Sequence, residues 1–420
     1  MTEKCSESSF NRLGDDLSQI ILSELPFEDR IRMECMSSQF SQLVYEKQLT
    51  LEINKILFEK LRKINSIDQV KFDLKSYKVF IKKLSNLKTL YIEYNTFWFE
   101  FSKFLELIEI TLKYCQLLDE INIIFVHITD IQANEFFKKF GHKIKRITFS
   151  FDENFMHDKS VCLVNLIYCS YLKEIDLGYI KHLFHGKNNC LVRSLNKLRF
   201  AFTNFQEDQK YFKSFVETNK NNLKCLEVFL PKNIEATPLM FLFKQITKLK
   251  NLTALKITFV KYFEQDLPSF LNEIAENCRN INDLDIRFAT NFFNTENLLK
   301  SIEKFKNLSK LSIYLVLNQD QSDNLVQYLI KCQNLQEINL VTAGSTLQDN
   351  ILFEIHKNLP KIQELWINDT DMSFTEISPK YLLFKHHPAI INEGIINCKD
   401  NLKKLTIDEI PMHASCNLKI

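Results

Sequence analysis

A short pattern of apolar residues recurs along most of the chain. Each copy has an apolar residue, two variable residues, a second apolar residue, one variable residue and a third apolar residue, usually with Asn directly before it. The copies begin at Leu87, Leu118, Ile144, Leu172, Leu195, Leu223, Leu252, Ile281, Leu308, Leu335, Ile362 and Leu402. Successive first residues are 31, 26, 28, 23, 28, 29, 29, 27, 27, 27 and 40 positions apart. Twelve copies at this spacing predict a repeat architecture.

Each repeat is expected to contain one strand and one helix. The last two apolar residues of a triplet are two positions apart, so both lie on the same face of a strand. The first apolar residue belongs to the turn that precedes this strand. Between two triplets, Asp266 is a suitable N-cap for a helical stripe formed by Leu267, Phe270, Leu271, Ile274, Ala275 and Cys278. Similar stripes occupy residues 136–140, 161–169, 212–216, 239–246, 298–305, 325–330 and 351–355.

A strand and a helix in about 27 residues cannot bury both of their apolar faces alone, so neighbouring repeats must stack. The predicted fold is therefore an α/β solenoid with parallel strands inside and helices outside. The pattern resembles the helix-containing leucine-rich-repeat family over residues 84–407. That family places Asn or Cys eight residues after the first apolar residue, and Asn95 fits. Later repeats instead carry Pro231, Val260, Ala289, Val316, Ala343 and Thr370 there.

The segment before the repeats has a different pattern. Leu17, Ile20, Ile21 and Leu25 share one helical face, and Pro26 ends this run. Two further short helical stretches follow, one carrying Ile31 and Met33 and the other Met36, Phe40, Leu43 and Val44. Three such short helices cannot hide all of this apolar surface by themselves.

This segment, from Leu13 to Phe40, resembles an F-box, although Gly14 replaces the usual Pro and Phe40 the usual Trp. The resemblance implies a small all-α F-box over residues 10–46, followed by a connecting segment and solenoid cap over 47–83 and by the solenoid over 84–420. It also implies that one set of residues docks a ligase adaptor: Leu17, Ile20, Ile21, Leu25, Pro26, Ile31, Met33 and Phe40. The alternative is that these residues are the core of a helical cap on the solenoid.

An F-box followed by leucine-rich repeats implies a non-catalytic substrate-recognition subunit of an SCF-type E3 ubiquitin ligase, with the adaptor, a cullin and an unknown protein substrate as partners. A scaffold or inhibitor that acts without a ligase is the alternative. Insertions in repeat proteins often map to the binding face, and the long last step predicts one at about residues 368–400. The candidate substrate contacts are Phe374 and Tyr381 in this insertion and the strand positions Arg287, Tyr314, Asn339 and Trp366. An ordinary surface is the alternative.

Composition argues against several other functions. The net charge of +2 provides no field that would attract nucleic acid or an anionic membrane. Only six glycines occur, and neither a P-loop nor a G-x-S-x-G motif is present, so we expect no enzyme and no cofactor. The 36 phenylalanines are interpreted as packing between the strand and helix layers.

Cysteine and histidine positions predict no metal site. The eleven cysteines contain no C-x-x-C pair and are interpreted as reduced, mostly buried thiols, with Cys162 and Cys169 on an apolar stripe. His182 and His185 lack a third ligand at suitable spacing, and His386 and His387 are expected in a loop. Residues 1–11 are polar, and no run of about 18 apolar residues occurs, so a cytoplasmic or nuclear location without membrane contact is expected.

Overall fold

The computed structural model forms two compact units, residues 1–178 and 179–420. It describes residues 15–25, 29–31, 43–45, 48–54, 74–95, 100–126, 128–150, 163–185, 189–193, 195–202, 206–231, 234–259, 267–288, 295–316, 325, 327–343, 358–359, 361–362, 364–370 and 404–405.

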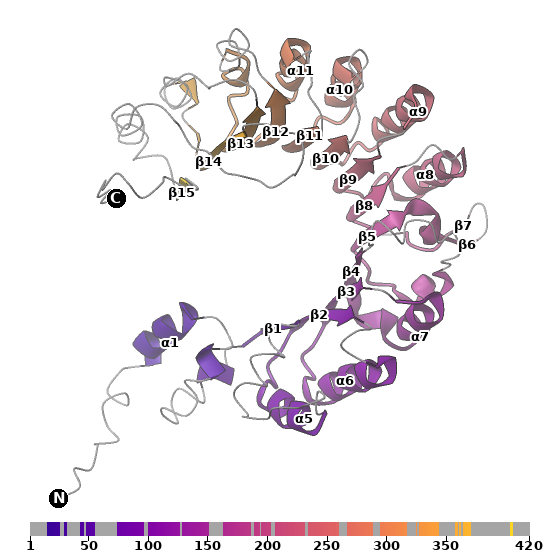
Figure 1. Cartoon of the computed structure of the whole chain (residues 1–420), viewed down its shortest axis with the longest axis vertical. Helices are drawn as coiled ribbons and strands as arrows, with labels where there is room; N and C mark the ends of the chain where they lie inside the picture. The colour runs from indigo at the N-terminus through magenta and orange to yellow at the C-terminus, as the bar shows by residue number, and fades with distance from the viewer. Residues whose placement is uncertain are drawn as a thin grey trace, which may run out of the picture. The chain divides into compact units, whose positions relative to one another are not determined.

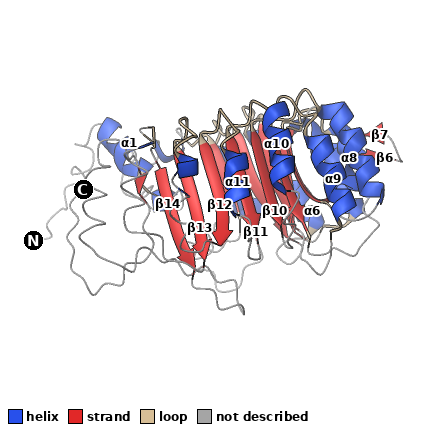
Figure 2. Cartoon of the chain, turned by 90° about the horizontal axis from the view of Figure 1, so that it is seen from above, coloured by secondary structure: helices blue, strands red, loops and turns tan. Residues whose placement is uncertain are grey.

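The first unit alternates strands with helices after an N-terminal helix. Its strands are parallel neighbours in the order β1-β2-β3-β4-β5. Helices cover one face of these strands, and we call the other side the open face (Figures 1 and 2). The elements are α1 Asp15–Ser23, β1 Thr50–Ile53, α5 Leu74–Lys83, β2 Thr89–Asn95, α6 Phe101–Tyr114, β3 Glu120–Val126, α7 Asp130–Phe140, η2 Gly141–Lys143, β4 Ile144–Ser150, η4 Val164–Tyr168 and β5 Glu174–Tyr179.

The second unit repeats the same scheme, with parallel strands in the order β8-β9-β10-β11-β12-β13-β14-β15. A separate antiparallel ribbon, β6-β7, precedes them. The elements are η5 Ile180–Leu183, β6 Phe184–His185, β7 Asn189–Cys190, β8 Lys197–Ala201, α8 Gln206–Asn219, β9 Cys225–Leu230, α9 Ala236–Ile246, β10 Ala254–Phe259, α10 Leu267–Asn277, β11 Asp283–Phe288, α11 Thr295–Ile302, β12 Lys310–Val316, β13 Glu337–Ala343, β14 Glu364–Thr370 and β15 Lys404–Leu405.

The register of the strands confirms the apolar triplets as the repeat unit. The second triplet residues of β9 to β15 pair with one another from strand to strand, as Leu226, Leu255, Leu284, Leu311, Ile338, Leu365 and Leu405. The same holds in the first unit, where Leu90 pairs with Ile121 and Ile92 with Ile123. Among the described side chains, these positions are at most 3% exposed, so the triplets form the inner layer of the core.

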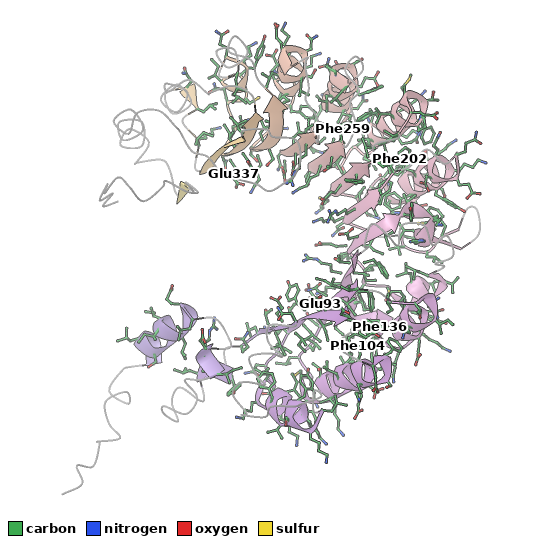
Figure 3. All side chains as sticks on the ribbon, viewed as in Figure 1. Glu93, Phe104, Phe136, Phe202, Phe259 and Glu337 are labelled. Atoms are coloured by element: carbon green, nitrogen blue, oxygen red, sulfur yellow. The ribbon has the colours of Figure 1, made fainter. Side chains whose placement is uncertain are left out.

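Phenylalanine fills the space between the strands and the helices, as predicted. Phe104 on α6 stacks on Phe136 of α7 with ring centres 5.5 Å apart, and Phe136 meets Phe125 of β3 edge-on at 5.4 Å. Phe202 and Phe212 pack in the second unit in the same way. In Figure 3, Phe104, Phe136 and Phe202 lie between strand and helix, whereas Glu93 and Glu337 lie on the open face. Each such ring pair stabilises the fold by about 0.5–1.5 kcal/mol beyond the contribution of its buried apolar surface.

The parallel sheet of the first unit begins with a strand, β1, that the triplet search did not find. β1 pairs in register with β2, and its Leu51 and Ile53 are fully buried at the second and third triplet positions. The first position of this triplet is the polar Gln48, and for this reason the search began at Leu87. β1 lies within the segment 47–83 that was interpreted as a connection and cap.

Two predicted helices are shorter than expected or missing. The stripe at residues 161–169 forms only the 3-10 helix η4, and residues 161 and 162 lie outside the described part of the chain. Gly141 packs against η4 so closely that a Cβ atom there would lie 2.9 Å from the backbone of Tyr168. After β5, the shortest step of 23 residues leaves too little chain for a helix, and η5 and the β6-β7 ribbon take its place.

The asparagines before the triplets form a hydrogen-bonded ladder in the second unit. Each side-chain Nδ2 donates to a backbone carbonyl of the preceding repeat: Asn222 to Arg193, Asn251 to Asn221, Asn280 to Lys250, Asn307 to Arg279 and Asn334 to Lys306, at 2.8–3.2 Å. The family pattern had led us to look for such residues after the strand. In this chain the ladder lies before it, and this explains the recurrent Asn.

Candidate protein-binding surfaces

Helix α1 exposes two of the predicted adaptor-binding residues. The side chains of Leu17 and Ile20 are 47% and 59% exposed, one helical turn apart, whereas Ser18 and Leu22 are buried. Ile21 and Leu25 are half-buried. Ile31, predicted for the same surface, is 9% exposed and belongs to the core. Gly14, Pro26, Met33 and Phe40 lie outside the described residues. Leu17 and Ile20 are therefore the most exposed apolar side chains among the described residues of α1.

Side-chain contacts connect this N-terminal segment to the first repeat. Arg30 donates from Nε to the carbonyl of Leu25 at 2.7 Å and from Nη1 to Gln48 Oε1 at 3.4 Å, while the Gln48 amide donates to the carbonyl of Thr50 in β1. Tyr45 is buried and meets Phe80 of α5 edge-on, with ring centres 6.5 Å apart. These contacts hold the end of α1 beside the first strand and helix of the sheet.

Three of the predicted substrate contacts, Tyr314, Asn339 and Trp366, belong to neighbouring strands of the second unit. Asn339 is in register with Trp366, and Tyr314 follows on β12 in the next row, opposite Val341. Asn339 is half-buried, and its Oδ1 has no hydrogen-bond partner among the described residues. The side chains of Tyr314 and Trp366, and Phe374 and Tyr381 entirely, lie outside the described part, while β14 extends into the predicted insertion as far as Thr370.

Ion pairs that the sequence did not reveal occupy the neighbouring strands of this face. Arg287, predicted as a substrate contact, donates from Nε and Nη2 to the buried carboxylate of Asp285 at 2.9 and 2.8 Å. Arg199 pairs with Glu227 at 3.2 Å. The register makes such partners direct neighbours on adjacent strands, or places them two residues apart on one strand. Many charged side chains on strands β8 to β11 are therefore paired with one another.

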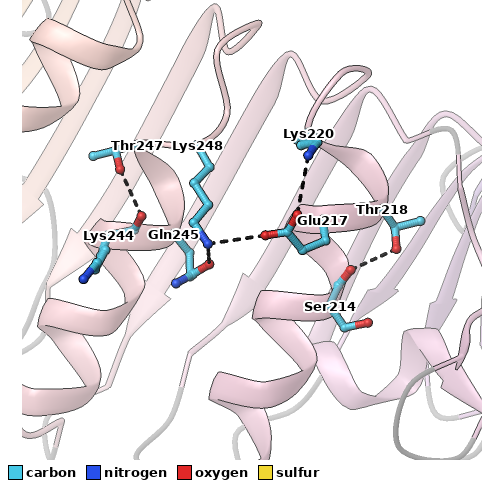
Figure 4. Close-up of polar contacts among 8 residues, drawn as sticks. All are labelled: Ser214, Glu217, Thr218, Lys220, Lys244, Gln245, Thr247 and Lys248. Atoms are coloured by element: carbon cyan, nitrogen blue, oxygen red, sulfur yellow. Dashed lines mark hydrogen bonds and ion pairs between the residues drawn. The ribbon is translucent and has the colours of Figure 1, made fainter.

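The helix layer shows the same internal pairing. Lys248, just after α9, donates to Glu217 of α8 at 3.3 Å and to Gln245 at 2.8 Å, and Lys220 is 3.5 Å from the same carboxylate (Figure 4). The hydrogen bond from Lys248 lowers the pKa of Glu217. These groups are exposed, so each pair contributes only about 0–1 kcal/mol. Paired, solvated charges of this kind do not by themselves mark a binding site.

Most of the described thiols are buried, as the sequence predicted. Cys115, Cys169, Cys190, Cys278 and Cys332 are buried and unpaired, and Cys225 is partly exposed. Burial raises the pKa of Cys115, Cys278 and Cys332 to about 11 and that of Cys169 to about 12, so these thiols stay protonated at neutral pH. No cluster of three or more His, Cys, Asp or Glu that could hold a metal exists among the described residues. None of the helices in that part of the chain has the length and apolar character needed to cross a membrane.

His182 is the most strongly perturbed imidazole in the described structure. Its side chain is 2% exposed, it meets the Tyr179 ring edge-on, and neither ring nitrogen has a hydrogen-bond partner among the described residues. Burial, aided by Lys181, lowers the pKa of His182 to about 4. The folded protein therefore keeps this ring neutral at a pH where the unfolded chain protonates it, and stability is lost as the pH falls below about 6.5.

We expect His182→Phe to remove this acid sensitivity. Between pH 7 and pH 5, the wild-type free energy of unfolding should fall by roughly 2 kcal/mol more than that of the variant. Urea unfolding at the two pH values, followed by circular dichroism, measures this difference. Equal losses in the two proteins would contradict the assignment of a neutral, unpartnered ring.

Comparison with known proteins supports the repeat architecture. No protein-family model matches the sequence, and no match to a curated protein sequence was found. Solved structures do match. A chain of the crystal structure of the Rad7 and Elc1 complex in yeast aligns with a TM-score of 0.50 and 13% identity, covering 90% of this chain and 94% of that one. The fold is a leucine-rich-repeat solenoid.

A second similar structure is the complex of TLR13 with ssRNA13. It aligns with a TM-score of 0.33 and 14% identity, covering 70% of this chain and 44% of that chain. At these identities the comparisons describe the fold. Binding partners must be argued from the surfaces of the solenoid itself.

Proposed function

We propose that this protein is a non-catalytic substrate-recognition subunit of an SCF-type E3 ubiquitin ligase. In this proposal, the N-terminal F-box-like segment docks the ligase adaptor, which is attached to a cullin, and the repeats bind a protein substrate. The observation that carries the proposal is the exposure of Leu17 and Ile20 on α1, within the segment whose sequence resembles an F-box. Exposed neighbouring apolar side chains are the usual anchors of a protein interface.

The proposed mechanism is bridging. A protein that holds the adaptor at one site and a substrate at another raises the effective concentration of the substrate near the enzyme that ubiquitinates it. The contacts of Arg30 and Tyr45 support this role, because they attach the adaptor-binding segment to the first repeat. The chain itself would catalyse no step and need no cofactor, and it would act in the cytoplasm or nucleus.

Co-purification tests the proposal. The adaptor and cullin should accompany the full-length chain and should be lost when residues 1–46 are removed. The alternative function is a leucine-rich-repeat scaffold or inhibitor that binds a protein without a ligase. If the adaptor and cullin never accompany the full-length chain, the ligase role fails and the scaffold role remains.

A further inference from the structure

A row of neighbouring side chains on the open face of the first unit has an unusual composition. The register places Glu52 beside Tyr91 and Tyr91 beside Asn122, on β1, β2 and β3. Glu93 follows two residues after Tyr91 and is paired with Ile124. The intervening residues Leu90, Ile92, Ile121 and Ile123 are in the core, so the row and Glu93 point to the open face, where Figure 3 labels Glu93.

Asn122 contributes an acceptor that lacks a donor. Its side chain is 3% exposed, and its Nδ2 donates to Glu120 Oε1 at 3.0 Å. This bond fixes the orientation of the amide, because a carboxylate only accepts hydrogen bonds. Oδ1 therefore faces away from Glu120, and it has no hydrogen-bond partner among the described residues. A buried acceptor without a donor costs about 1–3 kcal/mol.

The nearby cations are already used by other carboxylates. Lys145 lies 3.2 Å from Glu120 and 3.9 Å from Asp119, and Arg146, which is in register with Asn122, pairs with Glu174 at 2.9 Å. Within the described structure, Glu93 has neither an ion pair nor a hydrogen bond. Among the described residues, Glu52 accepts a hydrogen bond from the neutral amide of Asn54, at 2.7 Å.

The site is thus rich in acceptors and deficient in positive charge. Burial raises the pKa of Glu93, and repulsion by the charge of Glu52 raises it further. An approaching cation would relieve this repulsion and would also supply the donor that Asn122 lacks.

We propose that Glu52, Tyr91, Glu93 and Asn122 form a binding site for the cationic side chain of a lysine or arginine in a protein partner. Adjacent strands are about 4.8 Å apart and successive residues on one face about 6.7 Å apart, so one cation above Tyr91 is within reach of the three acceptors. The Tyr91 ring would contact the cation through its face. This site does not depend on the proposed ligase role.

Ile124 favours a lysine or arginine over a metal ion. Its side chain is 42% exposed beside Glu93 and offers apolar surface to the methylene stem of a long basic side chain. A metal ion would gain nothing from that surface or from an aromatic ring at the centre of the site.

The test uses the full-length chain and a fluorescent nine-residue Gly-Ser peptide that contains two arginines, with the same peptide carrying two glutamines as its neutral counterpart. At low salt, fluorescence anisotropy should show the arginine peptide binding about tenfold or more tightly than the glutamine peptide. Glu93→Gln and Tyr91→Leu should each weaken binding of the arginine peptide by about fivefold to tenfold.

The matched control is Glu337→Gln. Glu337 is another carboxylate on the open face, but it is paired with Lys310 at 2.5 Å, so its loss should leave binding of the arginine peptide unchanged. Equal weakening by Glu93→Gln and Glu337→Gln would mean unspecific attraction and overturn the proposal. Equal binding of the two peptides to the wild-type chain would also overturn it. Circular dichroism confirms that each variant is folded.

Discussion

Replacing Leu17 and Ile20 together by lysine is expected to abolish adaptor binding while the repeats remain folded. Both side chains are largely exposed on α1, so the change adds no charge to the core. In an interface, each apolar anchor contributes about 2 kcal/mol, so the double variant should bind roughly a thousandfold more weakly. Isothermal titration of the full-length variant with purified adaptor measures the loss, and circular dichroism checks the fold.

Ile131→Lys is the control for this experiment. Ile131 on α7 is 81% exposed and lies outside the F-box-like segment, so the same change of an exposed isoleucine should leave adaptor binding intact. Unchanged affinity in the double variant would rule out α1 as the docking helix. Equal losses in the double variant and the control would indicate unspecific apolar association.

The second large effect is expected at Asn219, the last residue of α8. Its side chain is fully buried, and its amide accepts from the backbone N–H of Leu195 and donates to the carbonyls of Val192 and Phe215, each at 3.3 Å. Asn219→Ala leaves the buried N–H of Leu195 without its side-chain acceptor, whereas the carbonyl of Val192 still accepts from the Cys190 thiol at 3.2 Å. Urea unfolding should show a loss of about 2–3 kcal/mol.

Asn277 supplies the matched control, because it is also the last residue of its helix, α10. Its amide donates to the carbonyl of Glu273 at 2.8 Å, but the residue is exposed, so water replaces the lost bond. Asn277→Ala should change the free energy of unfolding by no more than about 0.5 kcal/mol. Similar losses at both positions would mean that the buried network around Asn219 does not stabilise this repeat specifically.

The repeat fold could be predicted because it is specified by burial. A strand that packs against helices on one face needs apolar residues at fixed positions, and Leu255 and Ile257 satisfy this rule as their neighbours in register do. The search for apolar triplets failed where a polar residue takes one of the three positions. Gln48 replaces an apolar residue and is bonded to the backbone of β1, so the strand that follows it was missed.

The candidate sites were less predictable, because they depend on contacts between repeats. The F-box resemblance implied that Ile31 contributes to the adaptor-binding surface, with a place in the core as the alternative; its side chain is buried, because a resemblance in sequence does not tell which side chains neighbouring segments cover. Arg287 was predicted as a substrate contact without knowledge that it holds Asp285. The lack of a donor for Asn122 could not be inferred either, because it depends on the pairing of Arg146 with Glu174 across two strands.

The asparagine ladder has a consequence for how such a chain can change in length. Each rung uses a donor from one repeat and an acceptor from the repeat before it. Duplication or loss of one whole 27- or 29-residue module therefore leaves every remaining donor opposite an acceptor. The rungs persist across steps of both 27 and 29 residues, so they fix where two repeats meet while the length of chain between two rungs can vary.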